Sequence, residues 1–357
     1  MADPIQEVLN AFARGEIVVV TDDDDREGEG DLIVAASLCT AEKMAFIIRH
    51  TSGIVCAPIT TDDARRLRLD PMVSHNDSSH TTAFTVSIDY KPDGGTGISA
   101  EERASCCRAL ANPNAGAGDF ARPGHIFPLI ARDGGVLLRS GHTEAAVDLC
   151  KLSGLPPVGV ISELMNDDGS VMKGEQVARF AASHKLKHVT IADMIAYRQA
   201  REKLIERVAT FTTESPIGTL QGYAYRSPFD SIAHAAFVYN GIGDGKRVLT
   251  RLHKPNIVKD LFAGPQRMQT VLQHFKKAGR GVLVYLRDGA AGVPVEPVGP
   301  KTAEADRNRQ WREVGVGAQI LRDLGVTSIV NLTSSVHDYK GLSGFGIEIV
   351  GNEPFEG

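Results

Sequence analysis

The sequence predicts an α/β protein built from two domains. Its 357 residues exceed the roughly 100–200 residues of a typical domain, so two hydrophobic cores are expected. Short β-branched apolar runs alternate with segments of helical periodicity along the chain, a pattern typical of helices that cover a sheet. The composition changes near the Pro- and Gly-containing segment 211–219. We therefore expect one domain over residues 1–207 and a second over residues 208–357.

The first half is expected to alternate between strands and helices. Apolar runs rich in β-branched residues predict strands at 16–21, 32–38, 53–59, 83–89, 126–131 and 157–165. Apolar residues at helical spacing predict helices at 4–14, 41–50, 61–67, 100–110, 174–183 and 190–207. The segment 136–154 should run from a strand through a turn into a helix, and 112–125 should be a loop. Thr40 is a predicted N-cap, and Ser99 with Glu102 forms a capping box before the helix at 100–110.

The second half shows a similar alternation. We expect strands at 247–253, 280–288, 327–333 and 345–350, and helices at 265–278 and 311–324. A Gly-, Pro- and Ala-rich stretch at 288–310 predicts an irregular exposed loop.

Composition and charge exclude several classes of protein. Apolar residues make up 42% and charged residues 23%, which excludes wholesale disorder and fibrous repeats. A net charge of −5 and a pI of about 6.1 argue against binding to nucleic acid or to an anionic membrane. The longest apolar run near the N-terminus, Ile17 to Val20, is too short for an export signal or a membrane span.

Cysteine usage points to a reducing compartment. The five cysteines all lie at or before residue 150 and show no CxxC spacing, so neither a disulfide framework nor a thiolate zinc cage is expected in the first half. The second half has no cysteine. With no export signal, we expect a cytoplasmic protein.

The acidic segment 22–31, DDDDREGEGD, carries the strongest chemical signal. Seven acidic residues and one arginine lie between two apolar strands. One interpretation is a solvated loop, as for most charge runs. The other is a site for Mg²⁺ or Mn²⁺, because clustered carboxylates repel one another unless a cation is present and hard cations prefer oxygen ligands.

The segment 139–149, RSGHTEAAVDL, predicts an anion site at the start of a helix. Ser140 or Thr143 can cap this helix, Gly141 allows close backbone approach, and Arg139 lies beside the helix N-terminus. Phosphate is the anion that such a site suits best. His142 by itself is more typical of a structural turn than of a metal ligand.

Three further residues have a chemical and a structural interpretation. His125 follows a Pro-Gly turn, where a histidine ordinarily donates to a backbone carbonyl. Glu163 interrupts an apolar strand, so its carboxylate must be paired, be protonated or bind a ligand. Cys56 lies in an apolar strand without a linked histidine and is interpreted as a small core residue rather than a nucleophile.

Five segments in this order resemble the 3,4-dihydroxy-2-butanone 4-phosphate synthases of riboflavin biosynthesis. They are TDDDDREGEGDL, GISAEERA, RPGHIFPL, RSGHTEAAVDL and ISELMNDDGS, and the resemblance covers residues 3–207. The resemblance implies an α+β domain, usually a homodimer with its active site near the interface. It also implies conversion of D-ribulose 5-phosphate to L-3,4-dihydroxy-2-butanone 4-phosphate and formate, with Mg²⁺ or Mn²⁺ as cofactor.

The resemblance assigns roles to individual residues. The family's divalent-metal ligands fall on Glu27 and His142, and its essential acid/base groups fall on His125 and Glu163. Its substrate contacts fall on Arg26, Glu27, Asp31, Arg139, Ser140, Gly141, His142, Thr143 and Glu163. One departure is Gly28, which stands where many relatives are expected to have asparagine.

The second half resembles the GTP cyclohydrolase II domain that is often fused to this synthase. RGVLVYLRD, GVGAQILRDLGV and GLSGFGIEIV carry this resemblance, but the three cysteines that hold Zn²⁺ in the active family are missing. Gln310, Val314 and Asp338 replace the expected aspartate, tyrosine and lysine, while Arg312 persists. We therefore expect an inactive second domain and no zinc. The alternatives are a bifunctional enzyme that also opens GTP, and a second domain that acts as a binding or regulatory module.

Overall fold

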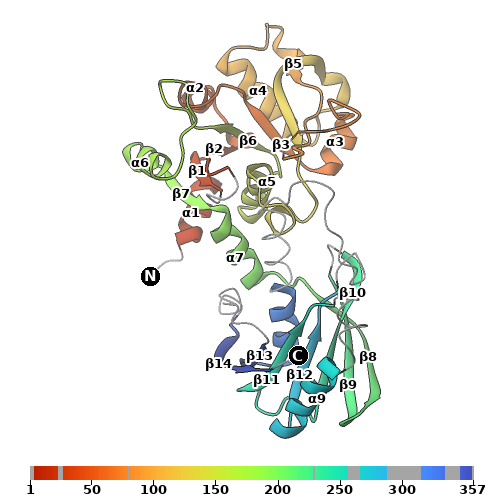
Figure 1. Cartoon of the computed structure of the whole chain (residues 1–357). Helices are drawn as coiled ribbons and strands as arrows, with labels where there is room; N and C mark the ends of the chain where they lie inside the picture. Colours follow the sequence, from red (N-terminus) through yellow and green to blue (C-terminus); the bar gives the residue numbers. More distant parts are fainter. Residues whose placement is uncertain are drawn as a thin grey trace. The chain divides into compact units, whose positions relative to one another are not determined.

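The computed structural model of the chain divides into two compact units, Met1–Tyr197 and Arg198–Gly357 (Figure 1). It describes residues 4–22, 27–78, 80–227, 230–255, 266–287, 315–333 and 346–355. Within these ranges each unit contains one sheet with helices, so the predicted α/β class is confirmed. No helix in these ranges is long and apolar enough to cross a membrane.

The first unit is built on a mixed sheet whose described strands run in the order β4-β5-β3-β6-β2-β1-β7. The strands are β1 Val18–Thr21, β2 Gly30–Ala35, β3 Cys56–Ile59, β4 Ile88–Tyr90, β5 Phe120–Ile130, β6 Gly159–Glu163 and β7 Lys187–Thr190. All residues of β2 and β3 are buried. Because helices cover both faces of these strands, their sequences are continuous apolar runs rather than alternating ones.

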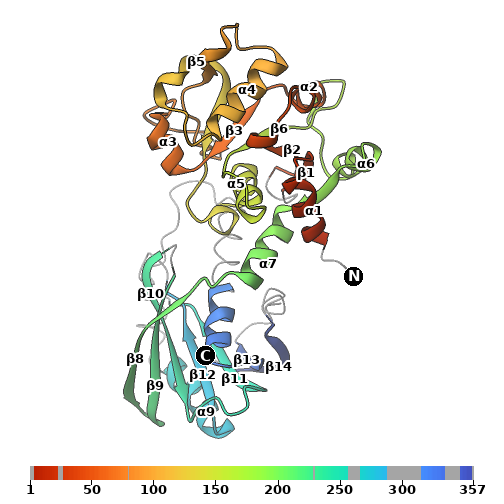
Figure 2. The same ribbon diagram turned by 180° about the vertical axis from the view of Figure 1, so that it is seen from behind.

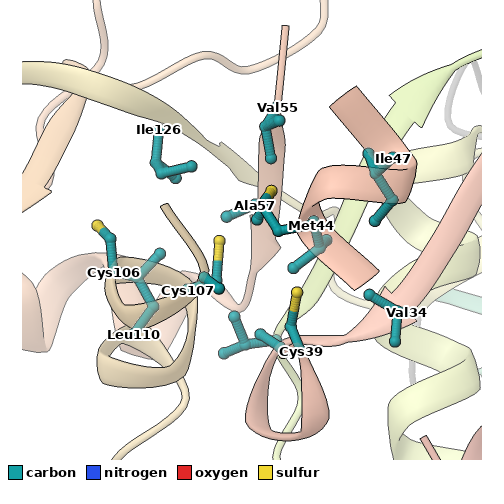
Figure 3. Packing of buried hydrophobic residues seen from close by; sticks show 14 of the residues in the cluster. Val34, Cys39, Met44, Ile47, Val55, Ala57, Cys106, Cys107, Leu110 and Ile126 are labelled. Carbon is teal, nitrogen blue, oxygen red and sulfur yellow. The ribbon is translucent and has the colours of Figure 1, made fainter. Parts of the chain in front are cut away.

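Helices lie on both faces of this sheet (Figure 1). They are α1 Pro4–Ala13, α2 Ala41–His50, α3 Thr61–Leu67, α4 Ala100–Leu110, α5 His142–Leu152, α6 Glu175–Ser183 and α7 Ile191–Arg201. On one face α2 packs against α4, and Figure 3 shows Met44 of α2 between Val34 of β2 and Cys107 of α4. The other face of β2 carries Asp31 and packs on α5, because side chains alternate along a strand. Asp31 and the start of α5 therefore share one side of the sheet.

The predicted helix caps are confirmed. The Thr40 side chain accepts a hydrogen bond from the Lys43 N–H (3.4 Å) at the start of α2. Ser99 Oγ accepts from the Glu102 N–H (3.2 Å), and the Glu102 carboxylate accepts from the Ser99 N–H (3.0 Å). Both signals are local in sequence, which explains why they could be read without the fold.

Three predictions between residues 83 and 138 are wrong in part. Only Ile88 and Asp89 of the expected strand 83–89 lie in β4, because Thr85 and Val86 bond to Pro128 and Asp70, two separate segments. The expected loop 112–125 ends earlier, since β5 begins at Phe120. The expected strand at the start of 136–154 is a 3-10 helix, Gly135–Leu137.

Two differences concern the end of the first unit. β7 was not predicted, and it pairs in parallel with β1. The helix expected over 190–207 stops at Arg201 in α7. β8 of the second sheet begins only at Glu206, and before it the Leu204 N–H donates to the Oε1 of buried Gln319 (2.6 Å). This tertiary contact is invisible in the local periodicity.

The second unit has a sheet in the order β14-β13-β11-β12-β10-β9-β8 over its described strands (Figure 2). They are β8 Glu206–Ser215, β9 Gly218–Ser227, β10 Asp230–Tyr239, β11 Val248–His253, β12 Gly281–Tyr285, β13 Ser328–Thr333 and β14 Glu348–Pro354, with α9 Gln266–Ala278 and helical residues 315–323. The four expected strands and both expected helices are present in this part of the chain. The antiparallel strands β8, β9 and β10 were missed, and 211–219 contains the turn of the β8–β9 hairpin.

Candidate active site

The sheet fixes both ends of the acidic segment between β1 and β2. Val20 lies opposite Asp31 in the β1–β2 pair, and Asp31 lies opposite Glu163 in the β2–β6 pair. Residues opposite each other in antiparallel strands share a face. Asp22 Oδ1 accepts a hydrogen bond from the Glu29 N–H (2.9 Å), which closes the base of the segment. The carboxylates of Asp31 and Glu163 are thus brought to the side of the sheet that carries α5.

Glu27 and His142, the two expected metal ligands, are brought together by the fold. They form a group with Asp22. Each of the three residues offers one potential ligand atom, and these three atoms all lie within 4.8 Å of one another. Asp22 and His142 are buried, and Glu27 is half-buried. Two carboxylates with one imidazole form a donor set that suits divalent ions such as Mg²⁺ and Mn²⁺. Sequence reasoning did not single out Asp22, although it is the first residue of the acidic run.

The hydrogen bonds of His142 assign its tautomer. Its Nε2 lies 3.2 Å from the carbonyl oxygen of Val20. A carbonyl oxygen only accepts, so Nε2 carries the proton, and in the neutral ring the lone pair is on Nδ1. Nδ1 lies 3.8 Å from Asp31 Oδ1. A histidine that binds a metal ordinarily donates its other N–H to a carbonyl or carboxylate, and His142 meets that requirement.

Asp31 is a buried carboxyl among the other carboxylates of the site. It is 2% exposed, and its Oδ1 has no hydrogen-bond partner among the described residues. Burial raises the pKa of Asp31 well above its usual range, and the charges of Glu163, Glu27 and Asp22 raise it further. A bound divalent cation would relieve this repulsion. The buried oxygen and the surrounding carboxylates therefore fit a metal-binding site.

We expect Asp31→Asn to stabilise the metal-free protein at neutral pH. Because the folded-state pKa of Asp31 is raised above its unfolded value of about 3.9, the native stability linked to this carboxyl is fully present below that value. That stability is lost as the pH rises through the folded pKa. Asparagine removes this loss, so we expect the free energy of unfolding of the variant to be higher than that of the parent by about 1–2 kcal/mol at pH 7 and equal to it near pH 3. Thermal unfolding in EDTA across this pH range measures the difference, and a variant that is less stable than the parent at pH 7 would contradict it.

Glu163 ends β6, and its carboxylate is hydrogen-bonded. Ser52 Oγ donates to Glu163 Oε2 (2.8 Å), so the carboxylate that interrupts this apolar strand is paired. Cys56 of β3 lies opposite Ile161 of β6 and is 4% exposed. Burial raises the pKa of the Cys56 thiol, and the charges of Glu163 and Asp31 raise it further. Cys56 therefore has the environment of a packing residue beside the site, as interpreted from the sequence.

Arg139 lies near the start of α5, with its guanidinium held by the protein. Nη1 donates to Glu144 Oε2 (2.6 Å), and Nη2 donates to the His80 carbonyl (3.2 Å) and to Thr82 Oγ1 (3.3 Å). Glu144 is 1% exposed and also accepts from the Arg132 N–H. These bonds fix the guanidinium in one place, where it can add to the positive end of the helix dipole.

The start of α5 differs from the expected cap. Gly141 is the N-cap residue, and no side chain caps the helix, so the prediction that Ser140 or Thr143 caps it is wrong. A Cβ at residue 141 would collide with the Arg139 guanidinium and with Glu144 Oε2. This close approach gives a physical reason for glycine at the position. Ser140 and Thr143 are buried beside it.

His80 is a neighbour of the site that sequence reasoning missed. Its Nε2 lies 3.3 Å from Glu27 Oε1. The only sequence signal was the Ser-, His-, Asn- and Asp-rich composition of 74–82. Arg139 reaches the same segment through the His80 carbonyl, so this segment connects the acidic cluster with the start of α5.

His125 lies in β5 and is paired with Asp89 of β4. Its Nδ1 is 2.8 Å from Asp89 Oδ2, and its backbone N–H donates to Asp89 Oδ1 (2.9 Å). Because a carboxylate only accepts, Nδ1 carries the proton, and in the neutral ring Nε2 can act as a base. Among the described residues, the hydrogen bonds of the His125 ring and backbone N–H go to Asp89 and not to Glu27 or His142.

Comparison with known proteins identifies the family. Residues 6–197 match the family model of 3,4-dihydroxy-2-butanone 4-phosphate synthase. The chain belongs to this family. Residues 206–354 match GTP cyclohydrolase II, so the predicted fusion of a synthase domain with a cyclohydrolase II-like domain is confirmed.

Similar proteins extend over both domains of this synthase. The chain is 44% identical to the bifunctional riboflavin biosynthesis protein RIBA 1 of Arabidopsis thaliana, over 98% of the chain and 68% of that protein. It is 42% identical to the riboflavin biosynthesis protein RibBA of Bacillus cereus, over 99% of the chain and 93% of that protein. The crystal structure of RibBX from A. baumannii, a two-domain 3,4-dihydroxy-2-butanone 4-phosphate synthase, superposes with a TM-score of 0.80 at 35% identity. The match covers 97% of this chain and 98% of the RibBX chain. These relatives confirm the predicted enzyme class and its place in riboflavin biosynthesis.

A single-domain structure adds information on the metal. A 3,4-dihydroxy-2-butanone 4-phosphate synthase in complex with two magnesium ions is 47% identical, with a TM-score of 0.55. The matched region covers 56% of this chain and 98% of the chain in that structure. Use of a divalent metal by this synthase family is thus supported by a solved relative.

The departure at Gly28 has a conformational explanation. Gly28 has φ of 65°, a left-handed conformation that glycine adopts freely and asparagine tolerates better than most residues. Glycine here and the asparagine expected in relatives therefore meet the same backbone requirement.

Several residues singled out from the sequence lie outside the described ranges. They are Arg26, Gln310, Arg312, Val314 and Asp338, together with the loop 288–310. In the described part of the second unit, His253 at the end of β11 is buried, with its ring 5.2 Å from that of Tyr285. No cysteine follows Cys150 in the sequence.

Proposed function

We propose that this synthase converts D-ribulose 5-phosphate to L-3,4-dihydroxy-2-butanone 4-phosphate and formate at the site between β1, β2, β6 and α5. The observation that carries the proposal is the convergence of Asp22, Glu27 and His142 beside Asp31, a buried carboxyl with an orphaned oxygen. Glu27 and His142 would hold Mg²⁺ or Mn²⁺. When bound, such an ion supplies stabilisation of the negative charge that develops on the oxygens of an enediolate.

The reaction needs groups that remove and return protons. A proton must leave C3 of the ketose phosphate, water must depart, the carbon skeleton must rearrange and one carbon must leave as formate. Glu163 and His125 are the proposed acid/base residues. Ser52 orients the carboxylate of Glu163, and Asp89 orients the ring of His125. Two oriented groups of different chemical type can divide these proton transfers between them.

The phosphate of the substrate is proposed to bind at the start of α5. The uncapped helix N-terminus at Gly141 and the fixed guanidinium of Arg139 supply donors and positive charge. Arg26, Asp31, Ser140 and Thr143 are the further proposed substrate contacts. Binding the phosphate away from the reacting carbons would leave the carboxylates free to act on the sugar.

We propose that synthase activity belongs to residues 1–207 and that residues 208–357 form a domain without GTP cyclohydrolase II activity. The absence of cysteine from this half supports the proposal, because the thiolate zinc site that activates water in that family needs three. The name of the RibBX relative, which mentions only the synthase, also supports it. A bifunctional enzyme is the alternative, favoured by the name of the Arabidopsis relative.

The assembly and location are proposed from the family resemblance and from composition. A homodimer with the active site near its interface would allow exposed residues such as His125 to complete a site. The net charge of −5 supports the absence of nucleic-acid and membrane partners. All five cysteines are free thiols. Free thiols support a cytoplasmic location, because the cytosol keeps cysteines reduced.

Parallel assays on the purified full chain test both halves of the proposal. We expect formate release from D-ribulose 5-phosphate with Mg²⁺, loss of that release in EDTA, no turnover of GTP and no stoichiometric zinc. Absence of formate release would overturn the proposed synthase site. Zinc-dependent release of formate from GTP would overturn the proposed inactivity of the second domain and favour the bifunctional alternative.

A further inference from the structure

The turn between α2 and β3 runs alongside the end of β6. Thr51 forms a bridge with Leu164, and the Ser52 N–H donates to the Glu163 carbonyl (2.9 Å). The Met165 N–H donates to the His50 carbonyl (3.1 Å) on the other side of this bridge. Backbone hydrogen bonds therefore hold this turn in a fixed register against the strand end that carries Glu163.

The turn is also anchored from its own side. Thr51 Oγ1 donates to the Ile47 carbonyl of α2 (2.7 Å) and accepts from the Gly53 N–H (3.2 Å). The Arg103 guanidinium of α4 donates through Nη1 to the Gly53 carbonyl (3.1 Å), and Arg103 is only 8% exposed. Ser52 lies between these two anchors, so its position relative to Glu163 is fixed by α2, α4 and β6 together.

The hydrogen bonds around Ser52 assign its single hydroxyl proton. Ser162 Oγ donates to the Ile54 carbonyl (3.0 Å), so the Ser162 proton is used there. Ser52 Oγ accepts from the Ile54 N–H (3.2 Å) and lies 2.8 Å from Glu163 Oε2 but 3.3 Å from Ser162 Oγ. The shorter contact is to an acceptor that carries charge when ionised, which strengthens the bond. The Ser52 proton is therefore donated to the Glu163 carboxylate.

We propose that Ser52 is a positioning residue for Glu163 and that the Ser52–Ser162 pair accommodates the Glu163 carboxyl in both of its protonation states. With the carboxylate ionised, Ser52 Oγ donates to it. When Glu163 takes up a proton on Oε2, that O–H donates to Ser52 Oγ, and the Ser52 hydroxyl turns toward Ser162 Oγ. No proton is gained or lost by the serines, and only the direction of the hydrogen bonds reverses.

This arrangement suits a group that must act as base in one step and as acid in another. A fixed donor such as a backbone N–H would favour only the ionised form, whereas a hydroxyl both donates and accepts. The inference rests on the proposed role of Glu163 in proton transfer. Because Ser52 touches Glu163 rather than being assigned to the substrate, its loss should slow turnover more than it weakens substrate binding.

The test compares Ser52→Ala, Ser52→Thr and a matched control, Ser170→Ala, in the full chain. Ser170 Oγ also donates to a carboxylate, Asp168 Oδ1 (2.6 Å), on the exposed turn after β6. For Ser52→Ala we expect kcat for formate release to fall about tenfold or more, with KM for D-ribulose 5-phosphate changed less than about threefold. Ser52→Thr should restore most of kcat, because the hydroxyl is kept and residue 52 is exposed enough for a methyl group. Ser170→Ala should keep the parent kcat.

Melting temperatures and a Glu163 variant separate the possible failures. Ser52→Ala should melt within about 3 °C of the parent, since an exposed hydrogen bond contributes little to folding. Parent-like kcat in Ser52→Ala, or an equal loss in Ser52→Thr, would overturn the positioning role. So would a loss of activity that accompanies a large fall in melting temperature. If Glu163→Gln itself keeps parent activity, the proposed function of Glu163 fails, whatever Ser52 does.

Discussion

Replacing Glu163 by glutamine should lower formate release from D-ribulose 5-phosphate by about a thousandfold or more. Glutamine keeps the size and a hydrogen-bonding oxygen for Ser52, which donates to Glu163 Oε2 at 2.8 Å. It cannot take up and return a proton, and loss of a positioned acid or base typically costs 10²–10⁴-fold in rate. The measurement is formate production over time at saturating substrate and Mg²⁺.

The fold of this variant should be preserved. Glu163 contributes its backbone to the β2–β6 pair and to the Ser52 N–H bond, and neither involves the carboxylate. Removing its charge should also stabilise the metal-free protein slightly, because that charge contributes to the raised pKa of Asp31. Turnover near that of the parent, with an intact melting transition, would show that Glu163 is not an essential acid or base.

The parts of the fold that sequence reasoning predicted are those with local causes. The N-cap of α2, the capping box of α4 and the apolar spacing of both helices depend on residues within one or two turns, and both helices begin and end as expected. The strand expected at 83–89 failed for a non-local reason. Thr85 and Val86 satisfy their N–H groups with two different segments, whereas a strand needs consecutive bonds to one neighbour.

The antiparallel strands β8, β9 and β10 of the second unit are present although the sequence did not predict them. β8 is an edge strand whose residues are almost all exposed, so it lacks the apolar alternation that identifies a half-buried strand. In the sequence, the helical spacing of apolar residues continues through Leu204 and Ile205. Ile205 belongs instead to the core of the second unit, and the Leu204 N–H donates to Gln319 Oε1.

The site was predictable to the extent that a motif carries it. The acidic run and the segment around His142 were singled out, and the fold brings Glu27 and His142 together. His80 and Ser52 were not found, because each reaches its carboxylate from a distant segment through tertiary packing. Their identities follow from the register of strands and turns, which composition and spacing do not specify.

Glu27→Gln should separate metal binding from folding, because its two expected effects have opposite signs. In EDTA the variant should be slightly more stable than the parent, since the Glu27 charge adds to the repulsion that raises the pKa of Asp31. With Mg²⁺ it should gain much less stability, because a ligand of the Asp22–Glu27–His142 group is lost. An affinity weakened about tenfold lowers the Mg²⁺-linked stabilisation by about 1.4 kcal/mol at high Mg²⁺.

Glu29→Gln is the matched control for this experiment. Glu29 belongs to the same acidic segment, but its carboxylate pairs with Lys173 Nζ (3.2 Å) and lies outside the metal group. Thermal unfolding of both variants in EDTA and across a MgCl₂ series measures the linkage directly, without relying on turnover. Glu29→Gln should keep the parent's response to Mg²⁺. If both variants lose the response equally, Mg²⁺ is attracted by the summed charge of the segment rather than held by Glu27, and the solvated-loop interpretation of the acidic run returns.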